Sequence, residues 1–398
     1  MATLSSIITP TNITTATNTQ TLTNKTLSAP TITGASSFST SAPSVIGSLG
    51  FRNRITNGAM RFDQRNVGGS KTASTFSNIY SADKWKVNMP TSCAGTAIQQ
   101  VTDAPTGFNY SNKITIGTGA SPATGDLNII YQPIEACDVS DFNSGTANAV
   151  SVAVSFWVKS SITGTYSFAI NNGPTPNRSY LVQFTINSAN TWEQKSASLT
   201  MDTSGTWLTS AGSVGMYAGF DIGSGTTYEG TASAWQAGNI KRISTNVKLV
   251  ATTGATFQFT GVQLEIGSAA TAYEKIPYQA ELARCQRYYW KSFLQGTAPV
   301  QNAGANTGEI TFVAGRSAAL TNTWQEIFPV TMASTPTITL YNQAAANAQV
   351  RDTDASADCS GSTTFNVSPR AFNIAATGNA TTSAGNNLRV HATADTAL

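Results

Sequence analysis

The sequence predicts an all-β protein built from antiparallel strands, and two observations indicate this class. Only 11% of the 398 residues are charged, against about 25% in an ordinary globular domain. Polarity comes instead from plentiful Gly, Ser, Thr and Asn, which suit strands and tight turns. Short segments of alternating apolar and polar residues also recur between Gly-rich and Asn-rich stretches. Because the chain is longer than one hydrophobic core usually supports, we expect two or three domains.

Residues 1–50 differ in composition from the rest of the chain. Thr, Ser and Asn dominate, and large apolar side chains are too sparse to form a core within one chain. The segment is therefore either disordered, or extended and packed against copies of itself. The apolar residues that such copies would bury are Leu4, Ile7, Ile8, Ile13, Leu22, Leu27 and Ile32.

Residues 51–277 carry the clearest strand patterns, and the spacing of these strands predicts an antiparallel β-sandwich that resembles a jelly roll. Val150–Val158 is almost continuously apolar, which is typical of a strand buried on both faces. Phe257–Ile266 alternates, but its apolar phase shifts across Gly261, as a β-bulge would produce. The other expected strands are Tyr166–Ile170, Tyr180–Ile186, Gly215–Ile222 and Asn246–Ala251.

The period of the pattern changes after Pro277. Leu282, Cys285 and Tyr289 recur at helical spacing, so we expect a short linking helix over residues 278–295. Residues 296–398 are expected to form a C-terminal β domain. Few large apolar residues follow Tyr341, and packing across a trimer axis would supply the missing burial. The expected strands are Glu309–Val313, Glu326–Val330, Thr335–Tyr341, Thr364–Val367, Ala371–Ile374 and Leu388–His391.

Several short motifs follow one another in a set order along the chain. They are Thr21–Ile32 (TLTNKTLSAPTI), Asn57–Gly58, Gln64–Arg65, the set Tyr80, Asp83 and Trp85, Gly261–Gly267 (GVQLEIG), Ala270–Glu274, Glu281–Lys291 (ELARCQRYYWK) and Phe328–Tyr341. In this order they closely resemble the tail fibre and tail appendage proteins of tailed bacteriophages. Each motif is moderately specific by itself, and the order of the motifs carries the resemblance.

The resemblance implies a virion component that forms a homotrimer and reaches the bacterial surface. Residues 1–50 would then be an extended segment that attaches to other phage tail proteins, such as a baseplate, nozzle or adaptor. The expected location is the phage tail of the virion, after assembly in the host cytoplasm. The distal partner would be a host surface glycan or an outer-membrane receptor.

Composition excludes some other classes of function. The formal net charge is +3 and the basic residues are scattered, so we expect no nucleic-acid binding. No apolar run approaches the roughly 20 residues of a membrane helix, and we expect no membrane insertion. The four cysteines lie far apart in sequence and are expected to be free thiols, with a disulfide or metal cluster as the alternative.

The sequence offers little for catalysis, and we expect neither an enzyme nor a cofactor. The one histidine, His391, has no Ser or Cys in a nucleophile-elbow context. A host-glycan depolymerase is the enzymatic alternative, because paired carboxylates cleave polysaccharides. The carboxylates that could form such a pair are Asp138, Asp141, Asp202, Asp221 and Glu229, and each lies among turn residues.

One acidic loop has partial metal-ligand spacing. Asp352, Asp354 and Asp358 are spaced like oxygen ligands in the first half of an EF-hand loop. Ala357 stands where that loop needs Gly, and Thr363 stands where it needs Glu. We therefore expect a polar loop without a bound metal, and a calcium site is the alternative.

A receptor-binding surface would consist of exposed aromatic and amide side chains on loops. Sugar rings stack on aromatic faces, and sugar hydroxyls pair with amides. The candidates are Trp207, Tyr228, Trp235, Tyr341 and Asn342, and core packing is the competing interpretation of each. Three functions therefore stay open: a fibre that recognises the host, a structural adaptor or head-decorating fibre without a receptor role, and a tailspike-like depolymerase.

Overall fold

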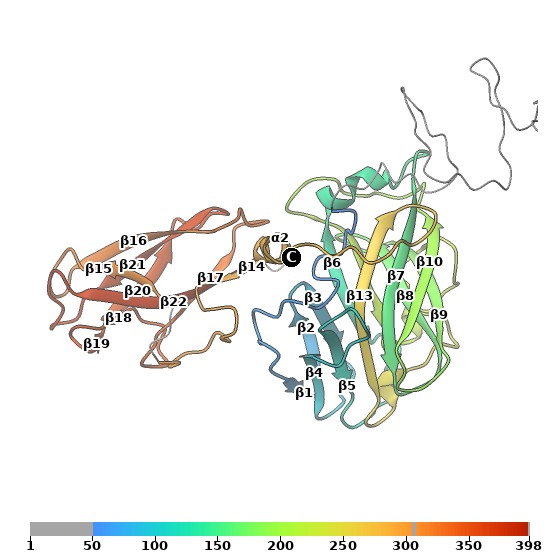
Figure 1. Cartoon of the computed structure of the whole chain (residues 1–398), viewed down its shortest axis with the longest axis horizontal. Helices are drawn as coiled ribbons and strands as arrows, with labels where there is room; N and C mark the ends of the chain where they lie inside the picture. The colour runs from blue at the N-terminus through green and yellow to red at the C-terminus, as the bar shows by residue number, and fades with distance from the viewer. Residues whose placement is uncertain (1–50, 305–307, 397–398) are drawn as a thin grey trace, which may run out of the picture. The chain divides into compact units, whose positions relative to one another are not determined.

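The computed structural model describes residues 51–304 and 308–396, which belong to one compact unit. The N-terminal candidates from Leu4 to Ile32 lie outside the described residues. The described chain is mostly β-strand, and all its strand pairs are antiparallel (Figure 1). The all-β prediction is therefore confirmed. No described helix is long and apolar enough to cross a membrane.

Two sheets form the sandwich. In spatial order, the first contains β1 (Lys71–Ala73), β4 (Thr96–Val101), β5 (Ser111–Thr115), β13 (Thr256–Ile266), β7 (Ser151–Ser160) and β10 (Glu193–Thr200). The second contains β12 (Gln236–Ala237), β9 (Arg178–Ile186), β8 (Gly164–Asn172), β11 (Val214–Asp221), β6 (Ile129–Glu135), β3 (Trp85–Met89) and β2 (Phe76–Ala82). This is the jelly-roll-like arrangement that the spacing of the strands predicts.

Aromatic side chains fill the space between the two sheets. Phe156 of β7 lies 5.3 Å from Phe168 of β8 and 5.0 Å from Phe220 of β11, measured between ring centroids. Phe220 in turn contacts Phe257 and Phe259 of β13. All five rings are almost completely buried. Rings of this size dominate the free energy of core burial, so this cluster holds the two sheets together.

The C-terminal strands surround a separate hydrophobic core. The longest strand, β22 (Asn387–Asp395), pairs with β14 (Tyr289–Lys291), β15 (Ile310–Val313), β17 (Thr337–Tyr341) and β18 (Arg351–Asp352), and β18 pairs with β19 (Ala357–Asp358). A three-stranded sheet contains β16 (Thr321–Ile327), β21 (Ala371–Thr377) and β20 (Gly361–Phe365). The large aromatic residues of this core are Trp290, Phe312, Phe328 and Phe372.

Short helices connect the strands. Three are 3₁₀ helices: Ala136–Phe142, Thr226–Tyr228 and Leu249–Ala251. The last corrects the strand expected at Asn246–Ala251, because the Asn246 side chain accepts the Ile243 N–H at 2.7 Å and closes a turn there. The α-helix α2 spans Tyr278–Gln286 and is shorter than expected, since Tyr289–Lys291 pairs with β22 instead. The domain boundaries at 277 and 296 stay predictions.

The bulge in β13 anchors the segment that precedes β1. The register of β13 against β7 shifts between Thr260 and Gln263, and Gly261 has a φ of +61°. Val262, freed from the ladder, donates its N–H to the Gly58 carbonyl at 3.0 Å. A Cβ atom on Gly58 would lie 2.1 Å from the Val262 carbonyl oxygen. Only glycine therefore allows this close approach.

We expect Gly58→Ala to destabilise the sandwich by about 1–3 kcal/mol, because the new methyl group overpacks against backbone that cannot yield. Urea unfolding measures this change through the midpoint. Gly125→Ala is the matched control, since its Cβ would meet nothing within 4 Å. Equal urea midpoints for Gly58→Ala and Gly125→Ala would contradict the close approach of Gly58 to the Val262 carbonyl.

Candidate functional site

The motif residues that carry the phage resemblance meet in one hydrogen-bonded cluster. Asn57 donates its backbone N–H to Glu281 of α2 across 224 residues of sequence. The Asn57 side chain donates to the carbonyls of Phe62 at 2.7 Å and Asp83 at 3.0 Å. The indole N–H of Trp85 donates to the Asn57 carbonyl at 3.2 Å. Asn57 is buried, and these bonds use its polar groups fully.

Gln64 and Asp83 extend the cluster to the C-terminal strands. Gln64 donates its backbone N–H and its side-chain amide to the two carboxylate oxygens of Asp83, at 3.0 and 2.7 Å. The same amide donates to the Tyr289 carbonyl at 3.1 Å, and the Lys291 ammonium donates to the Gln64 carbonyl at 2.9 Å. Burial acts to raise the pKa of Asp83, and Arg65 and Gln64 oppose it.

Arg65 fills the space between two motif tyrosines. Its guanidinium carbon lies 3.6 Å from the ring centroid of Tyr80 and 3.9 Å from that of Tyr289. The guanidinium also pairs with Asp395 of β22 at 2.9 Å and with Asp83 at 3.8 Å. Stacking between aromatic faces is a geometry that arginine adopts and lysine does not reproduce.

A second polar cluster holds the end of α2 on the sandwich. Arg287 donates Nε and Nη2 to the carboxylate of Glu135 at 2.7 and 2.5 Å, and the Tyr288 hydroxyl donates at 2.8 Å. Burial acts to raise the pKa of Glu135, but these bonds and the Gly212 N–H outweigh it and hold the pKa at about 2. The motifs that carry the resemblance therefore form a junction between the sandwich, α2 and the C-terminal strands.

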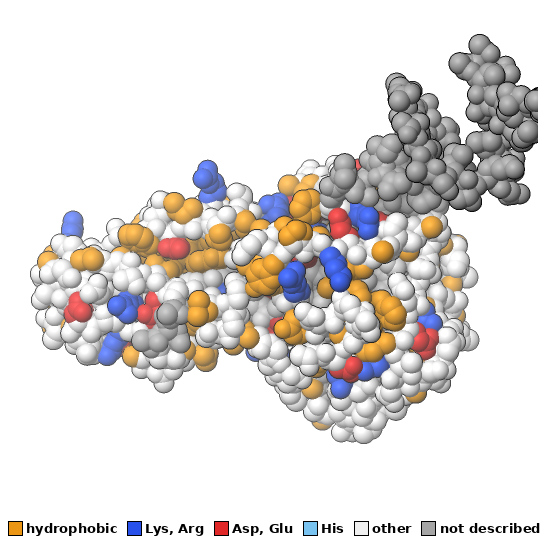
Figure 2. Space-filling view, in the orientation of Figure 1, with side chains coloured by type: hydrophobic (Ala, Val, Ile, Leu, Met, Phe, Trp, Pro, Cys, Tyr) orange, Lys and Arg blue, Asp and Glu red, His pale blue; other side chains and the backbone are white. Residues whose placement is uncertain are grey.

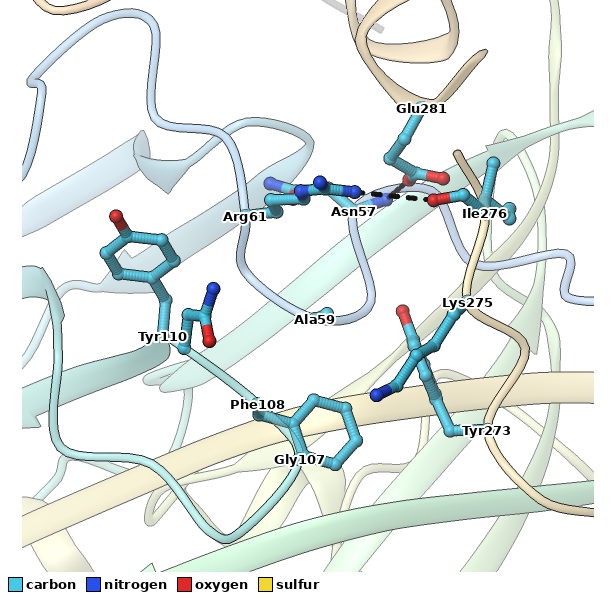
Figure 3. Close-up of a pocket in the computed structure, with 11 residues that line it drawn as sticks. Asn57, Ala59, Arg61, Gly107, Phe108, Tyr110, Tyr273, Lys275, Ile276 and Glu281 are labelled. Atoms are coloured by element: carbon cyan, nitrogen blue, oxygen red, sulfur yellow. Dashed lines mark hydrogen bonds between the residues drawn. The ribbon is translucent and has the colours of Figure 1, made fainter. Parts of the chain in front are cut away.

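A cavity of about 220 Å³ lies beside this junction (Figure 3). Phe108 and Tyr110 lie on one side of it, and Tyr273 and Lys275 face them from the segment before α2. Phe108 and Tyr273 meet edge to face, with 5.1 Å between ring centroids. The remaining lining residues are Asn57, Ala59, Arg61, Gly107, Asn109, Ile276 and Glu281. The sequence analysis missed this cavity, because three distant loop segments form it.

Two of the predicted recognition residues lie together. Trp207 and Trp235 contact each other edge to face at 5.5 Å, and Trp235 also packs against Tyr180 at 5.4 Å. Both indoles are half-buried, and each N–H donates to a backbone carbonyl, of Ser204 and Thr200 respectively. We call Trp207, Trp235 and Tyr180 the aromatic patch. Its rings combine partly exposed faces with fixed orientations.

An ion pair fixes the loop that carries Trp207. Arg178 donates two hydrogen bonds to Asp202, at 2.5 and 3.0 Å, and Asp202 also accepts the Ser204 N–H at 3.0 Å. Hydrogen bonds with Asp202 are the largest cause that raises the pKa of Arg178. Such bidentate pairs set geometry as well as energy, so the loop is ordered before any ligand arrives.

The other three candidates lie elsewhere. Tyr228 is half-buried in a 3₁₀ turn, and its ring makes no contact with the aromatic patch in the described chain. Tyr341 packs edge to face on Phe293 at 5.4 Å. Asn342 is buried, and its side chain bonds to Asn347 and to the Ala344 N–H. Asn342 thus stabilises a turn and does not present its amide to a receptor.

Arginine pairs four of the five carboxylates considered for catalysis. Asp141 pairs with Arg54, Asp202 pairs with Arg178, and both Asp221 and Glu229 pair with Arg242. In the acidic loop, Asp352 accepts from Asn386, Asp354 accepts from Asn387, and Asp358 pairs with Arg351. Among the described residues, no group of three or more His, Cys, Asp or Glu could hold a metal ion. All four cysteines are free, and Cys93, Cys285 and Cys359 are buried.

His391 lies close to two residues that the sequence analysis did not connect with it. Its Nδ1 is 2.9 Å from Ser292 Oγ, and its Nε2 is 3.8 Å from Glu309 Oε1. The imidazole is 1% exposed and stacks on Phe293 at 3.8 Å. Burial lowers its pKa to about 4. This geometry suits a packed core histidine and gives a substrate no access.

Comparisons with known proteins give only distant likenesses. No protein-family model matches the sequence. No curated protein matches it either. Among solved structures, the chain is similar to the enzymatically active domain of tailspike protein 4 from bacteriophage CBA120, at 14% identity and a TM-score of 0.28. That match covers 54% of this chain and 22% of the tailspike chain.

Two further structures show the same range of similarity. A putative sugar binding protein from Bacteroides thetaiotaomicron VPI-5482 matches at 12% identity and a TM-score of 0.31, over 54% of this chain and 100% of that chain. The tripod from the baseplate of bacteriophage Tuc2009 matches at 13% identity and a TM-score of 0.20, over 54% and 64%. The structural neighbours thus include phage tail and sugar-binding proteins, but TM-scores this low carry no argument about function.

We expect Glu135→Gln to lower the free energy of unfolding by roughly 1.5–3 kcal/mol at neutral pH, because it weakens charge-assisted bonds at a buried site. The pKa of Glu135 in the folded protein, about 2, lies below its ordinary value of 4.5. The stabilisation is therefore complete above about pH 4.5 and is lost as the pH falls towards 2.

Unfolding curves of the protein and this variant between about pH 6 and pH 3 measure the effect. The difference in the free energy of unfolding between the two proteins should become smaller as the pH falls below about 4.5. Asp141→Asn is the control, because its ion pair with Arg54 is exposed and is expected to contribute less than about 1 kcal/mol. If Glu135→Gln lowers the free energy of unfolding by the same amount at every pH, the ionised carboxylate is not the source of the stabilisation.

Proposed function

We propose that this chain is a non-enzymatic component of a phage tail, a fibre that attaches through its N-terminal segment and recognises the host surface. One observation carries the proposal. The motifs behind the resemblance, up to 227 residues apart, supply the partners of one hydrogen-bonded junction. Asn57, Gln64, Asp83 and Glu281 depend on one another for partners. Their joint presence supports a common architecture with the fibre family.

The aromatic patch is the proposed contact with a host glycan. Its rings are ordered in advance by backbone hydrogen bonds and by the Arg178–Asp202 ion pair. A rigid aromatic surface loses little conformational entropy when a ligand binds, which favours stacking against sugar rings. Pairing of four of the five candidate catalytic carboxylates with arginine supports binding without cleavage.

Exposed apolar side chains support the proposed trimer. Val313, Trp324, Ile327 and Phe365 lie on strands of the C-terminal core and are exposed by 37% to 62%. Figure 2 shows hydrophobic side chains gathered along these strands on the face in view. In the register of the three-stranded sheet, Ile327 and Phe365 lie on one face and Trp324 lies on the other. Large exposed apolar side chains are typical of a subunit interface. Homotrimer formation would bury them.

Replacing Trp207 and Trp235 together with Ala is expected to weaken binding to host cells by roughly tenfold or more, because each lost aromatic contact removes about 1 kcal/mol. Labelled protein is first screened on a panel of bacterial isolates, and the double variant is then titrated on an isolate that binds. Trp192→Ala is the matched control. Its half-buried indole N–H donates to Asp103, and it lies at the far end of β10 from Thr200, roughly 25 Å away.

Three outcomes would count against the proposal. Unchanged binding by the folded double variant would remove the aromatic patch from recognition. Binding to no isolate would favour the adaptor or head-decorating fibre without a receptor role. If the protein releases soluble sugars from the polysaccharide of an isolate that it binds, the depolymerase function would be favoured.

Light scattering is expected to give a mass about three times the 41.6 kDa of one chain, because closed threefold packing would bury the exposed apolar side chains. Ile327→Asp places a charge on one of them and should shift the mass towards that of the monomer. A monomeric mass for the unmodified full chain would contradict the trimer.

A further inference from the structure

The cavity beside the junction contains two cations without an acidic partner. Lys275 is exposed and its ammonium makes no hydrogen bond or ion pair within the described chain, while Figure 3 shows it projecting between Tyr273 and Phe108. Arg61 donates one bond, to the Ile276 carbonyl at 3.3 Å, and stacks on Tyr278 at 4.8 Å. A guanidinium has five N–H donors, so most of them are available to a ligand.

The acidic residue that lines the cavity does not neutralise these cations. Glu281 accepts the Asn57 N–H through Oε1, and its Oε2 lies 3.2 Å from Arg284 Nη1. Its charge is therefore compensated by Arg284, which does not line the cavity. Lys275 and Arg61 are both exposed and leave a local positive potential at the mouth of the cavity. Such a site attracts an anion.

The walls of the cavity suit a ring rather than a bare anion. Phe108, Tyr110 and Tyr273 supply aromatic surface on two sides. Asn109, on the same loop as Phe108, is exposed and its side chain makes no hydrogen bond within the described chain, so its amide can pair with hydroxyls. Burial raises the pKa of Tyr273, which keeps its hydroxyl protonated as a donor. A volume of 220 Å³ has room for about seven waters, the size of one sugar unit.

We propose that this cavity binds a sugar unit that carries a carboxylate, with the ring against the aromatic walls and the carboxylate at Lys275 and Arg61. The proposal deepens the proposed function and rests on it, because it names the class of glycan that the sandwich recognises. Charge-assisted bonds to the carboxylate distinguish this unit from a neutral sugar.

A second hollow beside the cavity could hold the neighbouring sugar units of a polysaccharide. This hollow, of about 530 Å³, shares Arg61 and Tyr110 with the cavity. Half-buried Gln99 and Gln100 line it, and amides of this kind pair with neutral sugar hydroxyls. The acidic unit can therefore belong to a longer chain.

Ligand-observed NMR titration of the full-length protein tests the inference with three probes: glucuronic acid, glucose and inorganic phosphate. Glucuronic acid is expected to bind about fivefold to tenfold more tightly than glucose, since the two rings differ by one carboxylate. The difference should shrink when salt is added. Equal affinity for glucuronic acid and glucose, or binding of phosphate as tight as that of glucuronic acid, would overturn the inference.

Lys275→Gln is expected to remove about fivefold to tenfold of the glucuronic acid affinity and to leave glucose unchanged. This lysine is exposed and without a partner, so its replacement should not affect folding. Lys71→Gln, on exposed β1, is the matched control, because Lys71 does not line the cavity. Full affinity in Lys275→Gln would overturn the inference.

Binding to bacterial cells separates this inference from the proposed function. If the protein binds an isolate through Trp207 and Trp235 but glucuronic acid does not bind, the acidic-sugar site is wrong and the fibre proposal stands. If glucuronic acid binds and requires Lys275, the inference is supported even where the aromatic patch variant still binds cells.

Discussion

The placement of α2 and β14 depends on one buried carboxylate. Glu135 ends strand β6 and is 1% exposed, and a charge at that depth is tolerated only with full pairing. Arg287, Tyr288 and the Gly212 N–H supply that pairing. Because Arg287 directly follows α2, satisfying Glu135 fixes the end of the helix. The chain then enters β14 two residues later, so the same pair sets where the C-terminal strands begin.

The motif residues that carry the resemblance form most of their hydrogen bonds within the junction. Asn57, Gln64 and Asp83 spend their hydrogen bonds on one another and on backbone groups, which leaves them little to offer a ligand. The groups that can still contact a ligand include the Lys275 ammonium, the Asn109 amide and the faces of Trp207 and Trp235. Recognition is therefore expected beside the shared junction, on loops that can vary without disturbing it.

Burial explains in part which features of the fold could be predicted from the sequence. The bulge in β13 was predicted correctly. The strand is buried on both faces, so the register shift at the bulge is visible in the sequence as a shift in the phase of its apolar residues. Strands β1 to β6, β10 (EQKSASLT) and β12 were not named among the expected strands, and β16 was placed too late in the chain. β10 and β16 are edge strands with mostly polar or exposed side chains, so alternation does not reveal them. β6 is mostly buried, so burial does not explain why it was missed. The tryptophans of the aromatic patch were named from the sequence, and their role in binding stays a prediction. The cavity could not be named, because it joins loops whose proximity no local pattern encodes.

The central claim is that the junction makes α2 and β14 one cooperative unit with the sandwich. Native-state hydrogen exchange tests it most directly, because it measures the free energy at which each backbone amide opens. The account predicts that the amides of α2 and β14 open at the same free energy as those of β7 and β13 in the sandwich. Exchange of α2 and β14 at a clearly lower free energy, with the sandwich still protected, would contradict it.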